Sequence, residues 1–361
     1  MKTVSVVGAR PQFVKAAVVS RALGAAGVQD VLVHTGQHYD GNMSGVFFAE
    51  LGIAEPAYNL KAGSGSHGRQ TAHMLQGIED ILLSERPQWV LVYGDTNSTL
   101  AGALAAVKLH IPVAHVEAGL RSWNRAMPEE INRVLTDHSS ALLFAPTTAA
   151  VRNLRAEGIQ GSQVRLVGDV MYDAVLLFTR MAVAVSDISS RLRLTKSGYV
   201  LATIHRAENT DSPTRLQAIL GGLARVARRL PVILPLHPRT RQVIAKNSDL
   251  QRAAAELQII PPVGYLDMLA LERQARVIAT DSGGVQKEAF FHRVPCVTLR
   301  DETEWEELIE LGCNRLAPPE QAETVAGAVE AALSTKVTVS DSPYGDGHTA
   351  QLIAKELAAA A

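Results

Sequence analysis

Residues 277–288 read Val-Ile-Ala-Thr-Asp-Ser-Gly-Gly-Val-Gln-Lys-Glu, and they join a short apolar run to a glycine turn and a helical start. The run Val277–Thr280 is apolar nearly throughout, as expected of a strand that is buried on both faces of a parallel sheet. Similar runs recur along the whole chain, each followed by a polar turn and an amphipathic stretch. Alternating strands and helices are typical of doubly wound α/β proteins, so we predict this fold class.

The predicted strands fall into two sets, separated by a stretch at Leu176–Arg193 that is expected to be helical. The first set is Thr3–Val7, Val31–Thr35, Trp89–Tyr93, Val113–Val116, Ala141–Phe144 and Val164–Val167. The second set is Tyr199–Ile204, Val232–Leu236, Gln258–Pro261, Val277–Thr280 and Cys296–Leu299. The expected helices between strands include Pro11–Leu23, Thr99–Leu109, Thr214–Arg229 and Gly284–Phe291. This pattern predicts two Rossmann-like domains.

The length of 361 residues also favours two domains, since one domain usually takes about 100–200 residues. We place them at residues 1–172 and 173–343, with a final helix at 344–361 that packs back on the first domain. The 35 basic and 36 acidic side chains give no signature of a nucleic-acid or membrane-surface protein. No stretch approaches the ~20 apolar residues of a membrane span, and Cys296 and Cys313 lack disulfide or metal spacing. A reduced, cytoplasmic setting fits these features.

Polar residues and glycines follow most of the predicted strands. Open α/β sheets bind ligands at the carboxyl ends of their strands, and two such domains face to face would line one cleft with those ends. The clearest element is Asp281-Ser-Gly-Gly284, where Ser282, Gly283 and Gly284 at a helix start can hold a phosphate. Glu288, one turn later, is a candidate for ribose hydroxyls. The alternative for Asp281–Gly284 is a tight turn between strand and helix that binds no ligand, and the alternative for Glu288 is a solvent-exposed charge on the helix.

Basic residues at other strand ends are candidate partners of a diphosphate. Arg10 follows the first strand, where a guanidinium can pair with two phosphate oxygens, and Lys15 would add a point charge. His205 and Arg206 follow a strand of the second half, and His237 lies before Pro-Arg as a further anion contact. Each of them alone is more often a surface charge. No G-x-x-x-x-G-K-[ST] or G-x-G-x-x-G pattern follows a strand, so ATP and NAD are not the leading ligands.

Three carboxylates are candidates for acid–base chemistry. Asp95 and Glu117 end adjacent strands, and Glu129 opens a helix. Crowding would raise at least one pKa, so that one carboxyl acts as an acid while another stays a base. A turn-capping role for Asp95 and a helix-dipole role for Glu129 are the structural alternatives. The histidines are scattered singly, so no metal is expected.

Taken together, these loops resemble the non-hydrolysing UDP-N-acetylglucosamine 2-epimerases, along almost the whole chain. The most specific matches are Tyr93-Gly-Asp-Thr-Asn-Ser-Thr99, His115-Val-Glu-Ala-Gly-Leu-Arg121, Pro128-Glu-Glu-x-Asn-Arg133, His205-Arg-x-Glu-Asn209 and Thr280-Asp-Ser-Gly-Gly284. The resemblance implies a GT-B-type fold with an interdomain active site, a homodimer, and no metal, nicotinamide or ATP. It also implies that UDP is eliminated to leave a 2-acetamidoglucal and is then added back with a proton on the other face.

The resemblance assigns roles residue by residue. Asp95, Glu117 and Glu129 look like the acid–base set, and His205 looks like a partner of the leaving group. It implies that Arg10, Ser282, Gly283 and Gly284 contact the diphosphate and that Glu288 contacts the ribose. We predict four further substrate contacts, Lys15, Arg133, Arg206 and His237. Gln37, His38, Arg69 and Gln70 match parts of a second UDP-GlcNAc site that activates some bacterial members.

Departures from the family pattern bear on the substrate. The family's common Gly-Thr-Arg-Pro-Glu is Gly-Ala-Arg-Pro-Gln12 here. The Thr-Glu-Arg-Pro-Glu loop that is typical of UDP-GlcNAc members is replaced by Thr303-Glu-Trp-Glu-Glu307. These variants look more like a subgroup that epimerises modified sugars such as UDP-2,3-diacetamido-2,3-dideoxyglucuronic acid. We expect UDP-GlcNAc and UDP-ManNAc as the substrate pair, with the diacetamido uronic acid as the other candidate. An inverting GT-B glycosyltransferase, a hydrolysing epimerase and a non-catalytic UDP-sugar sensor are the competing interpretations.

Overall fold

The computed structural model describes residues 1–37, 51–52, 55–338 and 342–360. The chain forms two compact units, one of residues 1–177 with 342–361 and one of residues 178–341. Their border lies inside helix α7 (Val170–Val185), five residues beyond the predicted position at 172. Asp169 explains the helix start, because its Oδ1 accepts a hydrogen bond from the Met171 amide at 2.8 Å. None of the described helices is long and apolar enough to cross a membrane.

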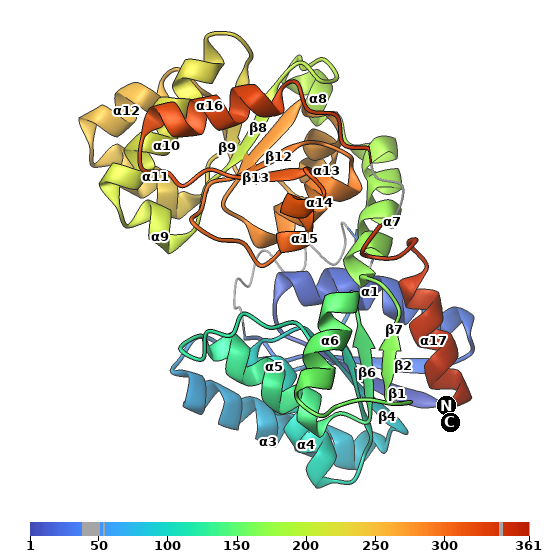
Figure 1. The fold of residues 1–361 in the computed structure, drawn as a ribbon. Helices are drawn as coiled ribbons and strands as arrows, with labels where there is room; N and C mark the ends of the chain where they lie inside the picture. The colour runs from blue at the N-terminus through green and yellow to red at the C-terminus, as the bar shows by residue number, and fades with distance from the viewer. Residues whose placement is uncertain (38–50, 53–54, 339–341, 361) are drawn as a thin grey trace. The chain divides into compact units, whose positions relative to one another are not determined.

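The first unit contains a 7-stranded parallel sheet in the order β3-β2-β1-β4-β5-β6-β7 (Figure 1). Its strands are β1 (Lys2–Val7), β2 (Gln29–His34), β3 (Tyr58–Asn59), β4 (Trp89–Tyr93), β5 (Val113–Val116), β6 (Leu142–Ala145) and β7 (Val164–Leu166). The chain winds outward from the centre in both directions, so β1 and β4 flank the point where the strand order reverses. Ligand sites of open α/β sheets lie at such a point, outside the carboxyl ends of the strands.

Helices cover both faces of this sheet. They are α1 (Arg10–Ala25), α3 (His67–Glu85), α4 (Asn97–Lys108), α5 (Pro128–Ser139), α6 (Thr148–Ala156) and α17 (Thr349–Ala359). The helices α3, α4 and α5 pack together, and the C-terminal α17 packs against α1 at the other end of the sequence. The contact of α17 with the first unit is specific, since the Ala350 amide donates to Asp173 Oδ1 at 2.9 Å and Arg165 pairs with Glu356 at 2.7 Å.

The second unit repeats the plan with a 6-stranded parallel sheet in the order β10-β9-β8-β11-β12-β13. Its strands are β8 (Val200–Thr203), β9 (Val232–Pro235), β10 (Gln258–Ile260), β11 (Val277–Thr280), β12 (Cys296–Thr298) and β13 (Asn314–Leu316). Its helices are α8 (Ile188–Arg191), α9 (Ala207–Thr210), α10 (Pro213–Ala227), α11 (Pro238–Ala245), α12 (Ser248–Ala254), α13 (Tyr265–Gln274), α14 (Gly283–Phe291), α15 (Glu306–Glu310) and α16 (Ala322–Ala332).

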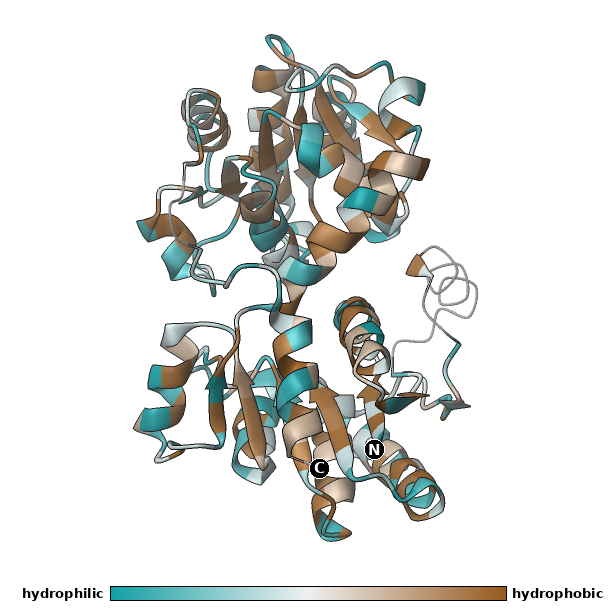
Figure 2. Cartoon of the chain, turned by 90° about the vertical axis from the view of Figure 1, so that its right-hand side faces the viewer, coloured by the Kyte–Doolittle hydropathy of each residue, from teal (hydrophilic) through white to brown (hydrophobic). Residues whose placement is uncertain are grey.

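The predicted α/β class is confirmed, and each predicted strand is present. The central strands are fully buried and apolar, which Figure 2 shows as brown arrows between helices with hydrophilic outer surfaces. The strands β3 and β13 escaped prediction because they lie at sheet edges and lack a continuous apolar run. The expected helix at Leu176–Arg193 is in fact two, α7 and α8, which are separated at Ser186. The Ser186 hydroxyl donates to Asp267 Oδ1 at 2.5 Å beside this break.

Gln12 joins the ends of two central strands. Its Oε1 accepts hydrogen bonds from the amides of Gly8 at 2.7 Å and Ala9 at 3.0 Å, directly after β1. Its Nε2 donates to the Tyr93 carbonyl at 2.6 Å, at the end of β4. The residue is only 2% exposed, so the two amides would otherwise be buried without a partner, whereas the Tyr93 carbonyl also accepts from the Thr99 hydroxyl at 2.7 Å. The residue that departs from the family pattern is therefore a structural cross-link.

Replacing Gln12 by alanine should destabilise the chain. The change leaves two buried amides without a partner and removes one of the two donors to the Tyr93 carbonyl, so we expect the free energy of unfolding to fall by about 2–4 kcal/mol. Urea denaturation followed by circular dichroism measures the change. The matched control is Gln29→Ala, on an exposed side chain of β2, which should shift stability by less than about 0.5 kcal/mol. Equal effects of the two substitutions would contradict this role of Gln12.

Candidate active site

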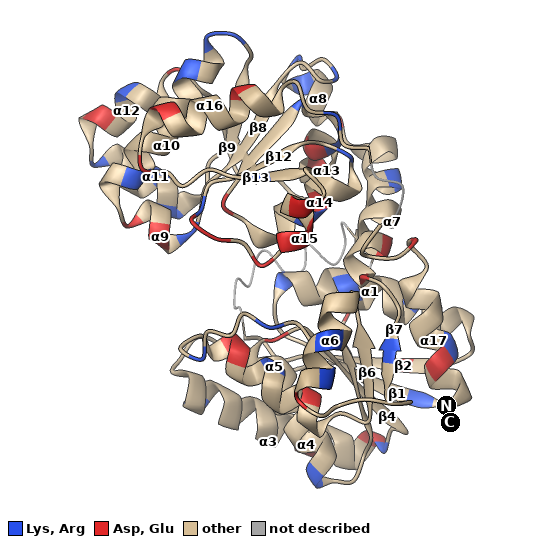
Figure 3. Cartoon of the chain, viewed as in Figure 1, with Lys and Arg blue, Asp and Glu red and all other residues tan. Residues whose placement is uncertain are grey.

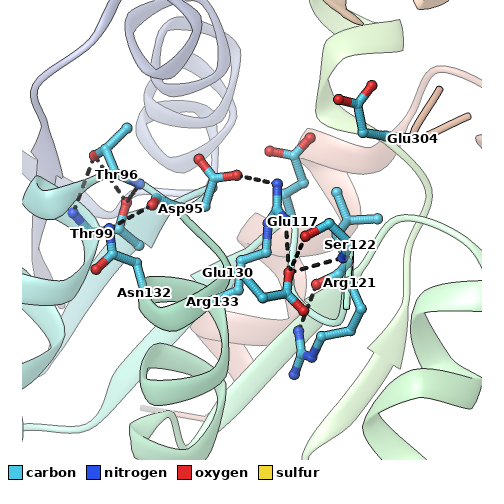
Figure 4. Close-up of polar contacts among 12 residues, drawn as sticks. Asp95, Thr96, Thr99, Glu117, Arg121, Ser122, Glu130, Asn132, Arg133 and Glu304 are labelled. Carbon is cyan, nitrogen blue, oxygen red and sulfur yellow. Dashed lines mark hydrogen bonds and ion pairs between the residues drawn. The ribbon is translucent and has the colours of Figure 1, made fainter. Parts of the chain in front are cut away.

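Two predicted carboxylates come together at the carboxyl ends of β4 and β5 (Figure 4). Asp95 follows β4, Glu117 follows β5, and the Nζ of Lys15 from α1 forms an ion pair with Glu117 Oε2. Gly94 permits this approach, because a Cβ there would lie 3.3 Å from Glu117 Oε2. Glu117 itself has φ of 74°, a left-handed conformation that costs a non-glycine residue about 1–3 kcal/mol. Such strain is characteristic of functional sites.

Arg133 ties Asp95 to the start of α5. Its guanidinium lies 2.6 Å from Asp95 Oδ2 and 3.0 Å from Glu130 Oε2. Burial raises the pKa of Asp95; the cations of Arg133 and Lys15 oppose that rise, and the Glu117 carboxylate adds to it. The two carboxylates therefore influence each other's ionisation, and each has its own cation. This arrangement keeps one carboxyl group able to hold a proton beside another that is charged.

Glu130, rather than its predicted neighbour Glu129, carries the structural contacts of α5. Glu130 accepts hydrogen bonds from the amides of Ser122 at 2.9 Å and Trp123 at 3.0 Å. Burial alone would raise the pKa of Glu130, but these hydrogen bonds and the contact with Arg133 hold it below its ordinary value. Glu129 is half-buried, and its carboxylate has no hydrogen bond or ion pair with any residue that the structure describes. The catalytic role of Glu129 stays a prediction.

A buried network of charged side chains holds the loops that carry Asp95 and Glu117. His115 Nδ1 lies 2.6 Å from Asp137 Oδ1, and His115 Nε2 donates to the Gly94 carbonyl at 2.7 Å. Asp137 also accepts from the Gly119 amide at 3.1 Å and pairs with Arg121 at 2.8 Å. Burial would raise the pKa of Asp137, but the two basic partners keep it below its ordinary value. Sequence reasoning missed Asp137, since a lone aspartate inside a helix gives no signal.

The predicted phosphate turn forms at the end of β11. Ser282 caps α14, and its hydroxyl accepts from the Val285 amide at 3.5 Å, so Gly283 and Gly284 occupy the first positions of the helix. Trp305 closes one side of the turn, because its Nε1 donates to the Gly283 carbonyl at 2.9 Å. The backbone amides of a helix start, with the helix dipole behind them, suit an anion. No local sequence pattern predicts a contact of Trp305 with this turn.

Asp281 holds the neighbouring loop of β8 against this turn. Its carboxylate is fully buried and accepts from the amides of His205 and Arg206, each at 3.1 Å, and from Asn209 Nδ2 at 3.1 Å. Burial would raise the pKa of Asp281, but His205, Asn209 and the Arg206 amide hold it below its ordinary value. The structure thus brings together His205, Arg206 and the Ser282–Gly284 turn.

The other predicted contacts have varied surroundings. The His237 ring lies 6.2 Å from the His205 ring, and Arg10 is exposed at the first position of α1. Glu288 is buried, and its Oε1 accepts from the Tyr265 hydroxyl at 3.1 Å. Burial raises the pKa of Glu288, so a role toward ribose would need this contact to be exchanged. That role stays a prediction.

Two residues of the predicted second site contact each other in the first unit. Gln70 Nε2 lies 3.3 Å from the Gln37 carbonyl, and Gln70 Oε1 accepts from Asn97 Nδ2 at 2.9 Å. Asn132 Nδ2 in turn lies 3.2 Å from Asn97 Oδ1 and donates to the Asp95 carbonyl at 2.9 Å. Hydrogen bonds therefore connect Gln70 to the Asp95 loop. Arg69 is exposed on α3, and His38 lies outside the described residues.

Over the described ranges, no three His, Cys, Asp or Glu side chains converge in a way that could hold a metal ion. The groups found at the carboxyl ends of the strands are paired carboxylates, cations and a helix-start turn. Two doubly wound parallel sheets with such groups at their carboxyl ends define an α/β enzyme of the GT-B type.

Comparison with known proteins agrees with this class. The family model described as UDP-N-acetylglucosamine 2-epimerase matches residues 21–358. The chain therefore belongs to the UDP-N-acetylglucosamine 2-epimerase family, and the predicted resemblance and isomerase class are confirmed.

The chain is similar to relatives with more than one substrate name. It is 49% identical to a UDP-2,3-diacetamido-2,3-dideoxy-D-glucuronate 2-epimerase of Pseudomonas aeruginosa, over 99% of each chain. It is 44% identical to the Methanocaldococcus jannaschii UDP-GlcNAc 2-epimerase, whose crystal structure in complex with UDP-GlcNAc and UDP matches with a TM-score of 0.88 over 99% of this chain and 100% of that one. The Neisseria meningitidis enzyme bound to UDP-GlcNAc is 28% identical, with a TM-score of 0.86 over 99% of this chain and 100% of that one.

Asp281→Asn should destabilise the second unit in a pH-dependent way. The side-chain NH₂ of asparagine would face the backbone amides that donate to the Asp281 carboxylate, and it cannot accept their hydrogen bonds. We therefore expect the free energy of unfolding to fall by about 2–4 kcal/mol at pH 7. The folded pKa of Asp281 lies below its ordinary value of 3.8, so its stabilisation is present above that value and is lost as the pH falls through the folded pKa. The difference between wild type and variant, measured by urea unfolding, should therefore shrink as the pH is lowered toward and below about 4.

The matched control is Asp211→Asn, an exposed partner of Arg239 at 2.6 Å in the same unit. It should cost less than about 1 kcal/mol at any pH. A loss for Asp281→Asn that is no larger than the loss for this control would show that the buried carboxylate does not organise the loop.

Proposed function

We propose that this chain is a non-hydrolysing 2-epimerase of UDP-2-acetamido sugars, with UDP-GlcNAc and UDP-ManNAc as its substrate pair. The single observation that carries the proposal is the coupled carboxylate pair Asp95 and Glu117, with a cation beside each carboxylate. Membership of the epimerase family supports the reaction class.

The reaction needs a proton to be removed and returned on opposite faces of C2. In the forward step a carboxylate takes the C2 proton, the C1–O bond breaks with its electrons going to UDP, and a C1–C2 double bond forms. In the return step an acid gives a proton to the other face of C2, and UDP adds back to C1. Positioned acid–base groups of this kind contribute about 10²–10⁴-fold each.

Asp95, Glu117 and Glu129 are the proposed acid–base set. Burial raises the pKa of Asp95, so this carboxyl group holds a proton more readily than an exposed aspartate would. The ion pair with Lys15 favours a charged Glu117. Coupled groups titrate as a set, so acid and base are assigned to the set rather than to one residue.

The second unit supplies groups that suit the departing diphosphate. Ser282, Gly283 and Gly284 present a helix start, while His205 and Arg206 follow the adjacent strand. A cation or a hydrogen-bond donor that meets the developing negative charge lowers the barrier to C1–O cleavage. We assign Arg10 and His237 to the same diphosphate on the strength of the family motif. The proposed enzyme acts as a homodimer, with a second UDP-GlcNAc at Gln37 and Gln70 as an activator.

A second substrate candidate rests on a specific observation. The loop at residues 303–307 departs from the pattern of UDP-GlcNAc members, and the relative that is 49% identical acts by name on UDP-2,3-diacetamido-2,3-dideoxy-D-glucuronate. A loop that contacts the sugar would adapt to the extra acetamido and carboxylate groups. Parallel assays of the two nucleotide sugars therefore belong in the first experiment.

Proton NMR in D₂O tests the proposal. UDP-GlcNAc alone should be converted to an equilibrium mixture with UDP-ManNAc, and deuterium should enter at C2. Asp95→Asn and Glu117→Gln should each lower kcat by about 10²–10⁴-fold, because each removes one proton-transfer group. The control Asp80→Asn, on an exposed carboxylate of α3, should keep wild-type turnover.

Each competing function predicts a different spectrum. A glycosyltransferase would leave UDP-GlcNAc unchanged without an acceptor, a hydrolysing epimerase would release free ManNAc and UDP, and a sensor would bind without exchange. Turnover of the diacetamido uronic acid with none of UDP-GlcNAc would change the substrate assignment only. Glu129→Gln should lose turnover while keeping its stability; unchanged turnover would remove Glu129 from the set.

Arg133→Met should shift the pH dependence of the reaction. Arg133 is the main group that opposes the rise in the pKa of Asp95, so its loss should raise that pKa further. The limb of the kcat/KM profile that reports Asp95 should move to higher pH by the same amount. Arg133→Lys keeps a charge and should shift the limb less. A profile that does not move in either variant would show that Asp95 does not titrate during turnover.

A further inference from the structure

The second unit contains a cavity of about 830 Å³ at the amino end of its sheet. Several of its lining residues lie directly before strands; Arg276 precedes β11, and Pro295 precedes β12. The strands are parallel, so this edge is opposite to the carboxyl edge where Ser282 begins α14. With 9 residues, α14 alone separates the two places by about 13 Å. The cavity is therefore distinct from the proposed diphosphate turn.

The charges around this cavity are almost all of one sign. Its described lining contains no Asp or Glu, and its cationic side chains are Lys196, Arg273, Arg276, Arg293 and Lys336. Arg276 donates to the Leu333 carbonyl, whereas the other four have no carboxylate within ion-pair distance over the described part of the chain. Figure 3 shows basic residues on the loops around α8, which adjoin this region. Cations held together without partners attract an anion.

The remaining polar lining consists largely of hydroxyl groups. Serine and threonine side chains come from the region after α7, from the loop before β8 and from the segment after α16. Gln274 Nε2 fixes one of them, Ser189, at 3.0 Å, and the Ser197 amide donates to the Gln274 carbonyl at 2.7 Å. Hydroxyl donors beside guanidinium groups match phosphate oxygens better than they match an apolar ligand.

His292 is a buried polar group in the wall of the cavity that has no hydrogen-bond partner. Its side chain is 5% exposed, and its Nε2 lies 3.8 Å from Glu272 Oε2, beyond hydrogen-bond reach. Burial and the neighbouring Arg273 lower the pKa of His292 to about 4, so the ring is neutral at pH 7. Because Nε2 faces the buried Glu272 carboxylate, the neutral ring of His292 closes the cavity wall on this side and adds no negative charge to it.

We propose that this cavity binds a small molecule that carries phosphate groups, at a site separate from the epimerase chemistry. The volume lies within the range of about 300–1,000 Å³ typical of small-molecule sites. Arg273 and Arg293 are the principal phosphate contacts, and Lys196 and Lys336 add charge; all four residues are exposed, so they can reach a ligand that enters the cavity from solvent. Three acidic side chains near the lining have other contacts: Glu272 faces His292, Asp267 accepts from Ser186, and Asp187 pairs with Arg191 at 3.3 Å.

A structural use of the same cations is the alternative. The C-terminal ends of α13, α14 and α16 lie at this edge, and basic residues there offset the negative end of each helix dipole. That explanation accounts for Arg273 and Arg293 but not for a cavity of this volume whose described lining has no acidic side chain. The two explanations differ in whether an anion binds.

Isothermal titration calorimetry of the full-length chain with inorganic pyrophosphate tests the proposal. The titration is run on Arg206→Gln, which weakens any binding at the Ser282–Gly284 turn and leaves the cavity intact. Pyrophosphate should still bind to this chain, and adding Arg273→Gln and Arg293→Gln should weaken binding by about tenfold or more, since two charge-assisted contacts are lost. Adding Arg228→Gln and Lys246→Gln instead removes two exposed charges of the same unit and should leave the affinity unchanged.

Hydrogen–deuterium exchange locates the bound ion. Pyrophosphate should slow exchange in peptides that cover residues 189–197 and 292–295. If the arginine double substitution does not fold, Lys196→Gln with Lys336→Gln supplies the same comparison from exposed positions. Absence of binding in the Arg206→Gln chain, or equal binding with and without the cavity arginines, would overturn the proposal. Lowered thermal stability without pyrophosphate binding in any chain would establish the helix-dipole explanation in its place.

Discussion

A buried carboxylate must be surrounded by donors, and this requirement shapes the strand-end loops of both units. In the first unit Asp137 contacts His115, Arg121 and the Gly119 amide. His115 in turn donates to the Gly94 carbonyl, which fixes the loop after β4. In the second unit Asp281 collects the amides of two successive loop residues after β8. Neither aspartate needs to touch a ligand to matter. Each fixes the backbone from which the reactive side chains project.

The first unit pairs each of the proposed catalytic carboxylates with a cation, and this arrangement bears on their ionisation. Lys15 accompanies Glu117, and Arg133 accompanies Asp95. A carboxylate pair without these cations would repel itself and favour a doubly protonated state that cannot accept a proton. With them, the burial that makes the site water-poor does not neutralise both groups. Proton removal and proton return then become possible at one location.

Much of this organisation was accessible from the sequence, because strand-end position and residue type carry strong signals. Asp95, Glu117 and the Ser282–Gly284 turn were predicted from apolar runs that end in polar residues, and the structure places them at carboxyl strand ends. Trp305 and Asp137 were not predicted, because their structural roles depend on tertiary contacts that leave no local sequence pattern. The edge strand β13 was missed for a related reason: its exposed Arg315 interrupts the apolar run that marks a central strand.

The C-terminal helix α17 belongs to the unit that also contains the N-terminus. In chain order the second unit is therefore an insertion within the first, and the polypeptide crosses the border between the units twice. One proteolytic cut near residue 177 cannot yield two whole halves, because the fragment that starts there also carries part of the other unit. Recombinant dissection must instead excise residues 178–341 as a single cassette and ligate 177 to 342 through a short flexible bridge.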